Sequence, residues 1–488
     1  MSVNAGTVGR TVGITTTFKD LQGGNVPFLQ QRIAVIGQGS TAVTYSTTKA
    51  VITSAAEVAQ NYGAGSPLHL AVLQLLPSNG DGVGNIPITV YPLADGTTAS
   101  AADITPSGTQ TVAADYQVRI NNILSPAFTI AAGATVAAIV TSIAEAINAE
   151  PNMPVVATDS TTVVDLASKW KGASANDIYV EVIGSTTAGT SFALTQAASG
   201  ATNPTVDAAL AQIGPTWETM VLNCLELADS TALNTFQTYG EGRWGTETHQ
   251  PLVVFTGNNT AAVATVVAIT DARKADKVNS VLVSPGANDL PLTIAARELS
   301  RIVLSANQDP ASGYGSLQAT GLTPGADSYQ WDSVERESAV LGGCSTVKIK
   351  NDIVNVADVL TCYHPDGEAH PAYRYVSSVV KLQTILFSLA SIFDTPEWDG
   401  APLVPDSQTV TNPNAKQPKM AKAAVATLLD ALGNAGIISD PNTAKAATQA
   451  SINSTDPNRL DIVVQVQLSG NANVISIDLN FGFFFGTV

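Results

Sequence analysis

The chain reads PLVVFTG at residues 251–257, NTAAVATVVAITDARKA at 259–275, VNSVLVS at 278–284 and LPLTIAARELSRIVLSAN at 290–307. The first and third stretches are short and rich in β-branched residues, which is typical of buried strands. The second and fourth have the length and apolar periodicity of helices, and residues 218–241 repeat the same order of strand and helix. Strands that alternate with helices of this length predict parallel βαβ units with right-handed crossovers.

The residues before this run extend the pattern into a mixed α/β core. RIAVI at 32–36 is a further buried strand, and residues 54–63 and 66–76 carry the capping and stop signals of two helices. Between residues 95 and 204 charged residues become less frequent, and short strand candidates surround one amphipathic helix at 135–149. This change of character predicts an inserted β-rich α+β domain.

We therefore predict the α/β fold class: a mixed core with βαβ units, an inserted β-rich α+β domain, and extended strand arms at both ends. The predicted domains are an N-terminal arm (1–30), the first part of the core (31–94), the inserted domain (95–204), the second part of the core (205–458) and a C-terminal strand arm (459–488).

The composition favours a protein that assembles with copies of itself. Only 13% of the 488 residues are charged, about half the usual share, so we expect much of the surface to lie in subunit contacts. The net charge of −17, without any basic run, argues against nucleic acid as a direct partner. We expect no signal peptide and no membrane span, and the three scattered cysteines fit a reducing cytosol.

Gly37-Gln38-Gly39-Ser40-Thr41-Ala42 formally matches the G-x-G-x-x-A pattern of dinucleotide-binding proteins. That motif requires the loop to open directly into a helix whose N-terminus holds the pyrophosphate. Here the next residues are β-branched and start a helix poorly. An α/β enzyme that uses the Gly37–Gly39 loop therefore remains only an alternative.

Other candidate chemistry is weaker. Cys362, His364 and His370 could hold a borderline-soft metal ion, but a second pair of cysteines is missing from the pattern. Asp229 and Asp289 follow predicted strands and could act together, although both have the sequence context of surface turns. We predict no catalytic residue, no cofactor and no metal site.

The last residues, RLDIVVQVQLSGNANVISIDLNFGFFFGTV at 459–488, contain two alternating runs at 461–468 and 474–479. Such runs predict strands, and the Gly/Asn-rich residues 469–473 between them suggest a link. A hairpin within its own domain is the simpler interpretation, and pairing with a strand of another subunit is the alternative. VGITTTF at 12–18 is either an arm or a disordered tail.

Three stretches resemble the contractile-tail sheath proteins of Mu-like phages. They are the helix pair ITSAAEVAQNYGAGSPLHLAV (52–72), the end of the inserted module VVDLASKWKGASANDIYVEV (163–182) and the hairpin ESAVLGGCSTVKIKNDIVNVADVLTCYH (337–364). The hairpin departs from the usual pattern, because Ala357-Asp358 stands near a basic position and Cys362 stands within a Thr-Thr pair.

This resemblance implies a structural role without enzymatic activity. A sheath subunit has an α/β core near the tail tube and an inserted module that faces outward. Such subunits form stacked hexameric rings as a homo-oligomer, and they contact the tail tube, baseplate and tail terminator proteins, but no nucleic acid and no membrane. Contraction of the sheath drives the tube through the bacterial envelope for genome ejection. The expected location is the virion tail, after assembly in the host cytoplasm; a tailocin or a secretion machine would be alternative hosts.

In such sheaths the terminal arms pair with strands of neighbouring subunits, and this makes arm exchange the favoured interpretation of both termini. The predicted inter-subunit strand positions are Val12, Ile14, Phe18, Val463, Val464, Val466, Leu468, Ile475, Ile477, Leu479, Phe481, Phe483 and Phe485.

Overall fold

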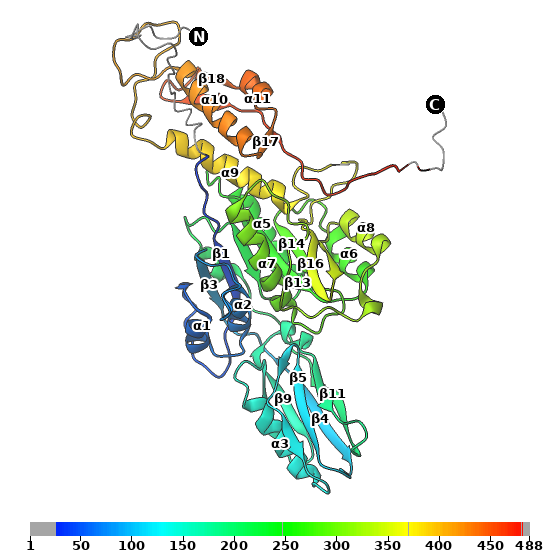
Figure 1. Ribbon diagram of the computed structural model, residues 1–488. Helices are drawn as coiled ribbons and strands as arrows, with labels where there is room; N and C mark the ends of the chain where they lie inside the picture. Colours follow the sequence, from blue (N-terminus) through cyan, green and yellow to red (C-terminus); the bar gives the residue numbers. More distant parts are fainter. Residues whose placement is uncertain (1–25, 246, 369, 480, 482–488) are drawn as a thin grey trace, which may run out of the picture. The chain divides into compact units, whose positions relative to one another are not determined.

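The computed structural model describes residues 26–245, 247–368, 370–479 and 481 (Figure 1). These residues divide into two compact units. The large unit contains residues 29–386 and the chain from 470 onward, and the small unit contains residues 387–469 together with 26–28.

A six-stranded sheet forms the centre of the large unit. Its strands, in spatial order, are β14 (Asn279–Val283), β13 (Val253–Asn258), β12 (Met220–Asn223), β1 (Ile33–Gln38), β3 (Ile88–Leu93) and β2 (Ala50–Ile52). The first five are parallel, and β2 joins the edge antiparallel to β3. Because helices cover both faces, these parallel strands are buried nearly throughout, as their apolar runs require.

The two faces of this sheet receive different helices because successive strand residues point to opposite sides. Ile33 and Val35 point to the face covered by α1 (Ala55–Tyr62), α2 (Pro67–Leu75) and α7 (Pro291–Gln308). Ala34 and Ile36 point to the face covered by α4 (Asp207–Ala211) and α5 (Ser230–Arg243). Beyond β14, α6 (Val263–Asp271) and α8 (Ser333–Leu341) enclose a further apolar cluster.

Residues between β3 and α4 form the inserted region, which has its own core around α3 (Val136–Asn148). One antiparallel sheet contains β5 (Ala114–Ile120), β6 (Ile123–Leu124), β7 (Phe128–Ile130) and β10 (Val180–Gly184). The other contains β4 (Ala99–Gly108), β8 (Val155–Asp159), β9 (Val164–Lys171) and β11 (Thr190–Ala198). The region closes on itself, since Thr98 bridges Ala201 and the Thr97 N–H donates to the Thr202 carbonyl at 3.3 Å. The predicted mixed α/β fold with a β-rich insertion is confirmed.

α9 (Val376–Phe393) starts in the large unit and ends in the small unit. Among the described residues it alone is long and apolar enough, by length and composition, to cross a membrane. Half of it is buried, as in the core helix of many soluble proteins, so it is weak evidence for a membrane span. The small unit then contains α10 (Pro418–Asn434), β17 (Ile438–Ser439), α11 (Pro441–Ala447), β18 (Gln449–Ile452), β19 (Leu460–Val463) and β20 (Gln467–Leu468).

The interpretation of residues 461–479 as one hairpin is wrong. β19 pairs antiparallel with β18, and β20 pairs with β17, so the first run finds its partners within the small unit. Residues 474–479 belong to no strand. Period-two alternation reports that a segment can form a strand, but it does not report which strand will be its partner.

Candidate functional site

The clearest surface feature of the large unit is its C-terminal stretch, residues 474–481, which we call the terminal segment. Its apolar side chains are exposed by 76% to 91%: Val474, Ile475, Ile477, Leu479 and Phe481. In an extended chain the four odd-numbered residues lie on one face, while Ser476 and Asp478 lie on the other. An uncovered apolar stripe of this kind indicates a surface that another strand or sheet covers.

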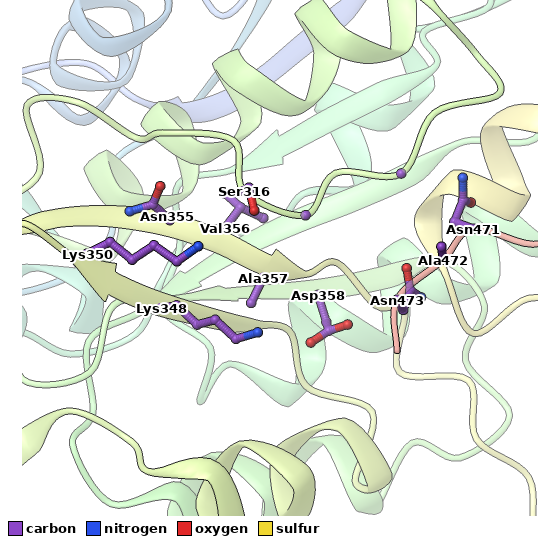
Figure 2. Close-up of a pocket in the computed structure, with 12 residues that line it drawn as sticks. Ser316, Lys348, Lys350, Asn355, Val356, Ala357, Asp358, Asn471, Ala472 and Asn473 are labelled. Atoms are coloured by element: carbon purple, nitrogen blue, oxygen red, sulfur yellow. The ribbon is translucent and has the colours of Figure 1, made fainter. Parts of the chain in front are cut away.

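A polar hollow of about 330 Å³ lies where the terminal segment begins. On one side are Lys348 and Lys350 of β15 (Thr346–Lys350) and Asp358 at the end of β16 (Ile353–Asp358). Figure 2 shows residues 471–473 lining the other side of the hollow. The root of the terminal segment therefore lies beside the β15–β16 hairpin.

The hairpin forms as its sequence predicts. Asn351 and Asp352 make the turn with φ values of 51° and 58°, and such left-handed pairs match the twist of a two-residue hairpin. β16 is covered on its second edge, where the Ser316 N–H donates to the Val356 carbonyl at 2.7 Å and the Ala319 N–H donates to the Val354 carbonyl at 2.9 Å. β15 pairs with β16 alone in the described part of the chain, so its outer edge is open to a further strand.

The predicted strand positions fall into three groups. Val463 and Leu468 lie in β19 and β20 of the small unit, and Val464 and Val466 lie between these strands. Ile475, Ile477, Leu479 and Phe481 form the exposed stripe of the terminal segment. Val12, Ile14, Phe18, Phe483 and Phe485 lie outside the described residues. The assignment of all three groups to inter-subunit pairing stays a prediction.

The Gly37 loop is packed against the protein itself. A Cβ atom on Gly37 would lie 2.9 Å from the Cβ of Cys224, and one on Gly39 would lie 2.5 Å from the ring of Tyr45. The next helix, α1, begins only at Ala55, so the helix N-terminus that a dinucleotide site needs is displaced by a strand and a loop. Close packing accounts for both glycines.

The same loop receives β9 of the inserted region. The Thr41 N–H donates to the Lys169 carbonyl at 2.7 Å, and the Gln38 side-chain amide donates to the Lys171 carbonyl at 2.6 Å. Between them, Trp170 is fully buried and packs with the core residues that cover the sheet. The Gly37 loop is therefore one of the places where the inserted region attaches to the core.

A second attachment lies at the turn between β5 and β6. The side-chain amide of Asn121 donates to the Asn288 carbonyl at 2.9 Å, and that of Asn122 donates to the Asp289 carboxylate at 3.2 Å. Burial raises the pKa of Asp289 to about 6, against the lowering effect of hydrogen bonds from Thr323 and Asn122. Asp289 thus joins the inserted region to the core, and this partner was not foreseen from its sequence context.

Two of the remaining candidate residues, Asp229 and His364, have structural partners. The Asp229 side chain accepts a hydrogen bond from the Ala232 N–H at 2.9 Å and so caps α5. The His364 ring contacts the Cys362 carbonyl at 2.7 Å and the Asp271 carboxylate at 3.1 Å. Burial raises the pKa of the Cys362 thiol. The described residues contain no group of three His, Cys, Asp or Glu side chains placed to share a metal ion.

Sequence patterns gave no sign of Asn471, which lies in the polar stretch that suggested a flexible link. Its side chain makes three hydrogen bonds with distant parts of the large unit. Short Gly/Asn-rich stretches suggest turns and links, and no pattern within them marks the one amide that has long-range partners.

The chain is similar to the Mu-like prophage FluMu tail sheath protein of Haemophilus influenzae, with 23% identity over 393 residues that cover 77% of each protein. This relative confirms the resemblance drawn from the sequence motifs. No protein-family model matches the chain.

Solved structures give likenesses of lower weight. A sheath tail protein from Listeria innocua is 14% identical, with a TM-score of 0.48 and coverage of 91% of this chain and 93% of that one. A chain of the anti-feeding prophage baseplate in its contracted state is 10% identical, with a TM-score of 0.49 and coverage of 97% and 99%. At these TM-scores we draw no conclusion from either likeness.

Proposed function

We propose that this chain is a structural subunit of a contractile tail sheath, which polymerises around a tail tube and contracts to drive that tube through a bacterial envelope. The observation that carries the proposal is the exposed apolar stripe of the terminal segment, on a chain similar to a prophage tail sheath protein. A stripe that the described residues of its own subunit leave exposed fits a protein that works as a polymer.

We infer that the terminal segment pairs with a neighbouring copy by strand addition. The open outer edge of β15 offers the main-chain groups that such pairing needs. Main-chain pairing would keep subunits linked while their compact units rotate and slide during contraction. The predicted N-terminal arm would add a second link of the same kind.

The finer assignments belong to the same proposal. We expect stacked hexameric rings, contacts with the tail tube, baseplate and tail terminator proteins, and a place in the tail of the virion after assembly in the host cytoplasm. We infer a structural and not an enzymatic role, in which the energy for contraction is stored in a metastable extended lattice. A phage-derived tailocin or a secretion machine would use the same mechanism.

Electron microscopy of two purified proteins tests this function. The first is the full chain, and the second ends at Asn473 and so lacks the terminal segment but keeps β19 and β20. We expect hollow tubes or stacked rings from the full chain, alone or with its tail tube protein, and dispersed folded particles from the shorter one. Circular dichroism checks that the shorter chain is folded. A full chain that stays dispersed under both conditions contradicts the proposal.

A further inference from the structure

The chain crosses between the two units three times, between residues 28 and 29, within α9 and again at Gly470. On the small-unit side of the last crossing, the Ser469 N–H donates to the Ile437 carbonyl at 3.1 Å. On the large-unit side, the Asn471 side chain is held by residues of the large unit. A single residue, Gly470, separates the two attachments, and a Cβ atom on it would meet nothing within 4 Å.

Asn471 is held by both ends of its amide group. Its Oδ1 accepts hydrogen bonds from the Lys381 ammonium at 3.0 Å and from the Ser377 hydroxyl at 3.2 Å, both on α9. Its Nδ2 donates to the Ala311 carbonyl at 2.9 Å. To satisfy all three partners, a side chain must accept two hydrogen bonds on one side and donate one on the other, as the amide group of Asn471 does.

The surroundings are shaped for this side chain. A Cβ atom on Gly313 would lie 3.3 Å from both the Cβ and the Cγ of Asn471, closer than ordinary contacts, so the absent side chain of the glycine makes room. Lys381 is buried, and a buried ammonium needs hydrogen-bond acceptors to offset its lost hydration. The bond to Asn471 therefore supports both residues.

We propose that Asn471 is the positioning residue of the terminal segment: it fixes the root of that segment to α9 and to the Ala311–Gly313 loop, so that the segment leaves the large unit from a set point. This rests on the proposed role of the segment in joining subunits. Val474, the first residue of the terminal segment, is three positions after Asn471, so the start of the segment stays within about 10 Å of the anchor.

A fixed root raises the efficiency of pairing with a second copy. A segment that starts from one place searches a smaller volume, which raises its effective concentration at the acceptor strand and lowers the ordering cost of binding. The anchor belongs to the large unit, because Asn471 and its three hydrogen-bond partners all lie in that unit.

Two variants with one matched control test the anchor in the full chain. N471A removes all three hydrogen bonds, and K381M removes the ammonium and keeps the apolar stem. N473A is the control, because the described structure shows no hydrogen bond of the Asn473 side chain. Hydrogen exchange of residues 309–314 and 470–473 reports the anchor, and the protein concentration at which tubes appear reports assembly.

We expect N471A and K381M to speed exchange at both peptides by roughly tenfold, as the loss of a hydrogen bond to a charged group implies. The critical concentration for tubes should rise several-fold in both, while the melting temperature stays close to that of the wild type. The double variant should be no worse than N471A alone, because N471A already removes the hydrogen bond that K381M removes. N471D keeps the two accepted bonds and should fall between N471A and the wild type.

The outcomes separate the anchor from the sheath function. Unchanged exchange in N471A overturns the anchor, whatever the wild type assembles into. Faster exchange with unchanged critical concentration overturns the positioning role and leaves the sheath function in place. A wild type that forms no tubes overturns the sheath function, and with it the positioning role, while the exchange data still decide whether the anchor exists.

Discussion

At the scale of single residues, Asp81 ties three distant segments together. It lies in the loop between α2 and β3, and its carboxylate is bound by Arg297 and Arg301 of α7. The Thr320 hydroxyl also donates to it at 2.8 Å. Desolvation acts to raise the pKa of Asp81, but the hydrogen bonds from Thr320 and the two arginines outweigh it and lower the pKa to about 2.

We expect Asp81→Asn to lower the free energy of unfolding of the large unit by about 1–2 kcal/mol at pH 7, after allowance for the partial exposure of the carboxylate. A pKa that is lower in the folded state stabilises the fold above the unfolded value of 3.8. This contribution is lost as the pH falls from about 4 to 2, so the difference between variant and wild type should shrink there.

Urea titrations at pH 7 and pH 3 measure this difference. Glu145→Gln is the control, because Glu145 is exposed on α3 and its removal should change stability little at either pH. A difference between Asp81→Asn and the wild type that is the same at both pH values would contradict the assigned cause.

The partners of residues such as Asp81 and Asn471 cannot be predicted from local sequence patterns. Asp81 is separated from Arg297 and Thr320 by more than 200 positions, and Asn471 is separated from Lys381 by 90. Caps could be found, because their partners lie within one turn: Ser54 accepts from the Glu57 N–H and Ser66 accepts from the His69 N–H.

At the scale of elements, β9 has two roles, because it is a central strand of one inserted sheet and also the strand that enters the core. Trp170 makes the second role possible. Its side chain is fully buried, and its indole N–H donates to the Ser174 hydroxyl at 3.1 Å. The strand itself could be predicted from alternation, but the core cluster that takes up its last apolar residue could not.

We expect Trp170→Ala to destabilise the large unit by about 3–5 kcal/mol, the usual cost of a cavity left by a buried Trp. Hydrogen exchange should rise in β9 and also in α1 and α2, whose residues share the cluster with Trp170. Leu194→Ala on β11 is the control, since that side chain is 46% exposed. Faster exchange confined to the inserted region would show that Trp170 does not join it to the core.

Regular elements with a period and caps of their own were the predictable part of the fold. The helices predicted at 66–76 and 135–149 appear as α2 and α3, and the hairpin within residues 337–364 appears as β15–β16. The terminal hairpin failed for a physical reason: strand partners are chosen by three-dimensional proximity, and β17 and β18 are the partners that the small unit supplies.

At the scale of the whole molecule, the terminal segment has one apolar and one polar face, and this gives a matched pair of variants. Ile477→Asp puts a charge on the apolar face, which we expect to be buried in the assembly, whereas Ser476→Asp puts the same charge on the other face. Both side chains are exposed in the single chain, so neither variant should change its melting temperature by more than a degree or two.

Tube formation followed by sedimentation and electron microscopy should separate the two. We expect Ile477→Asp to abolish tubes or to raise the critical concentration at least tenfold, and Ser476→Asp to assemble nearly as the wild type does. Equal assembly of both variants would mean that the apolar face stays uncovered in the polymer.

The inserted region is held at three separate places: its two paired chain ends at Thr98 and Ala201, the seat of β9 on the Gly37 loop, and the turn at Asn121 and Asn122. A region attached at one place can rotate about it, and a region attached at two places can rotate about the line between them. Attachment at three places removes this freedom, so we expect a force on the inserted region to turn the six-stranded sheet together with it.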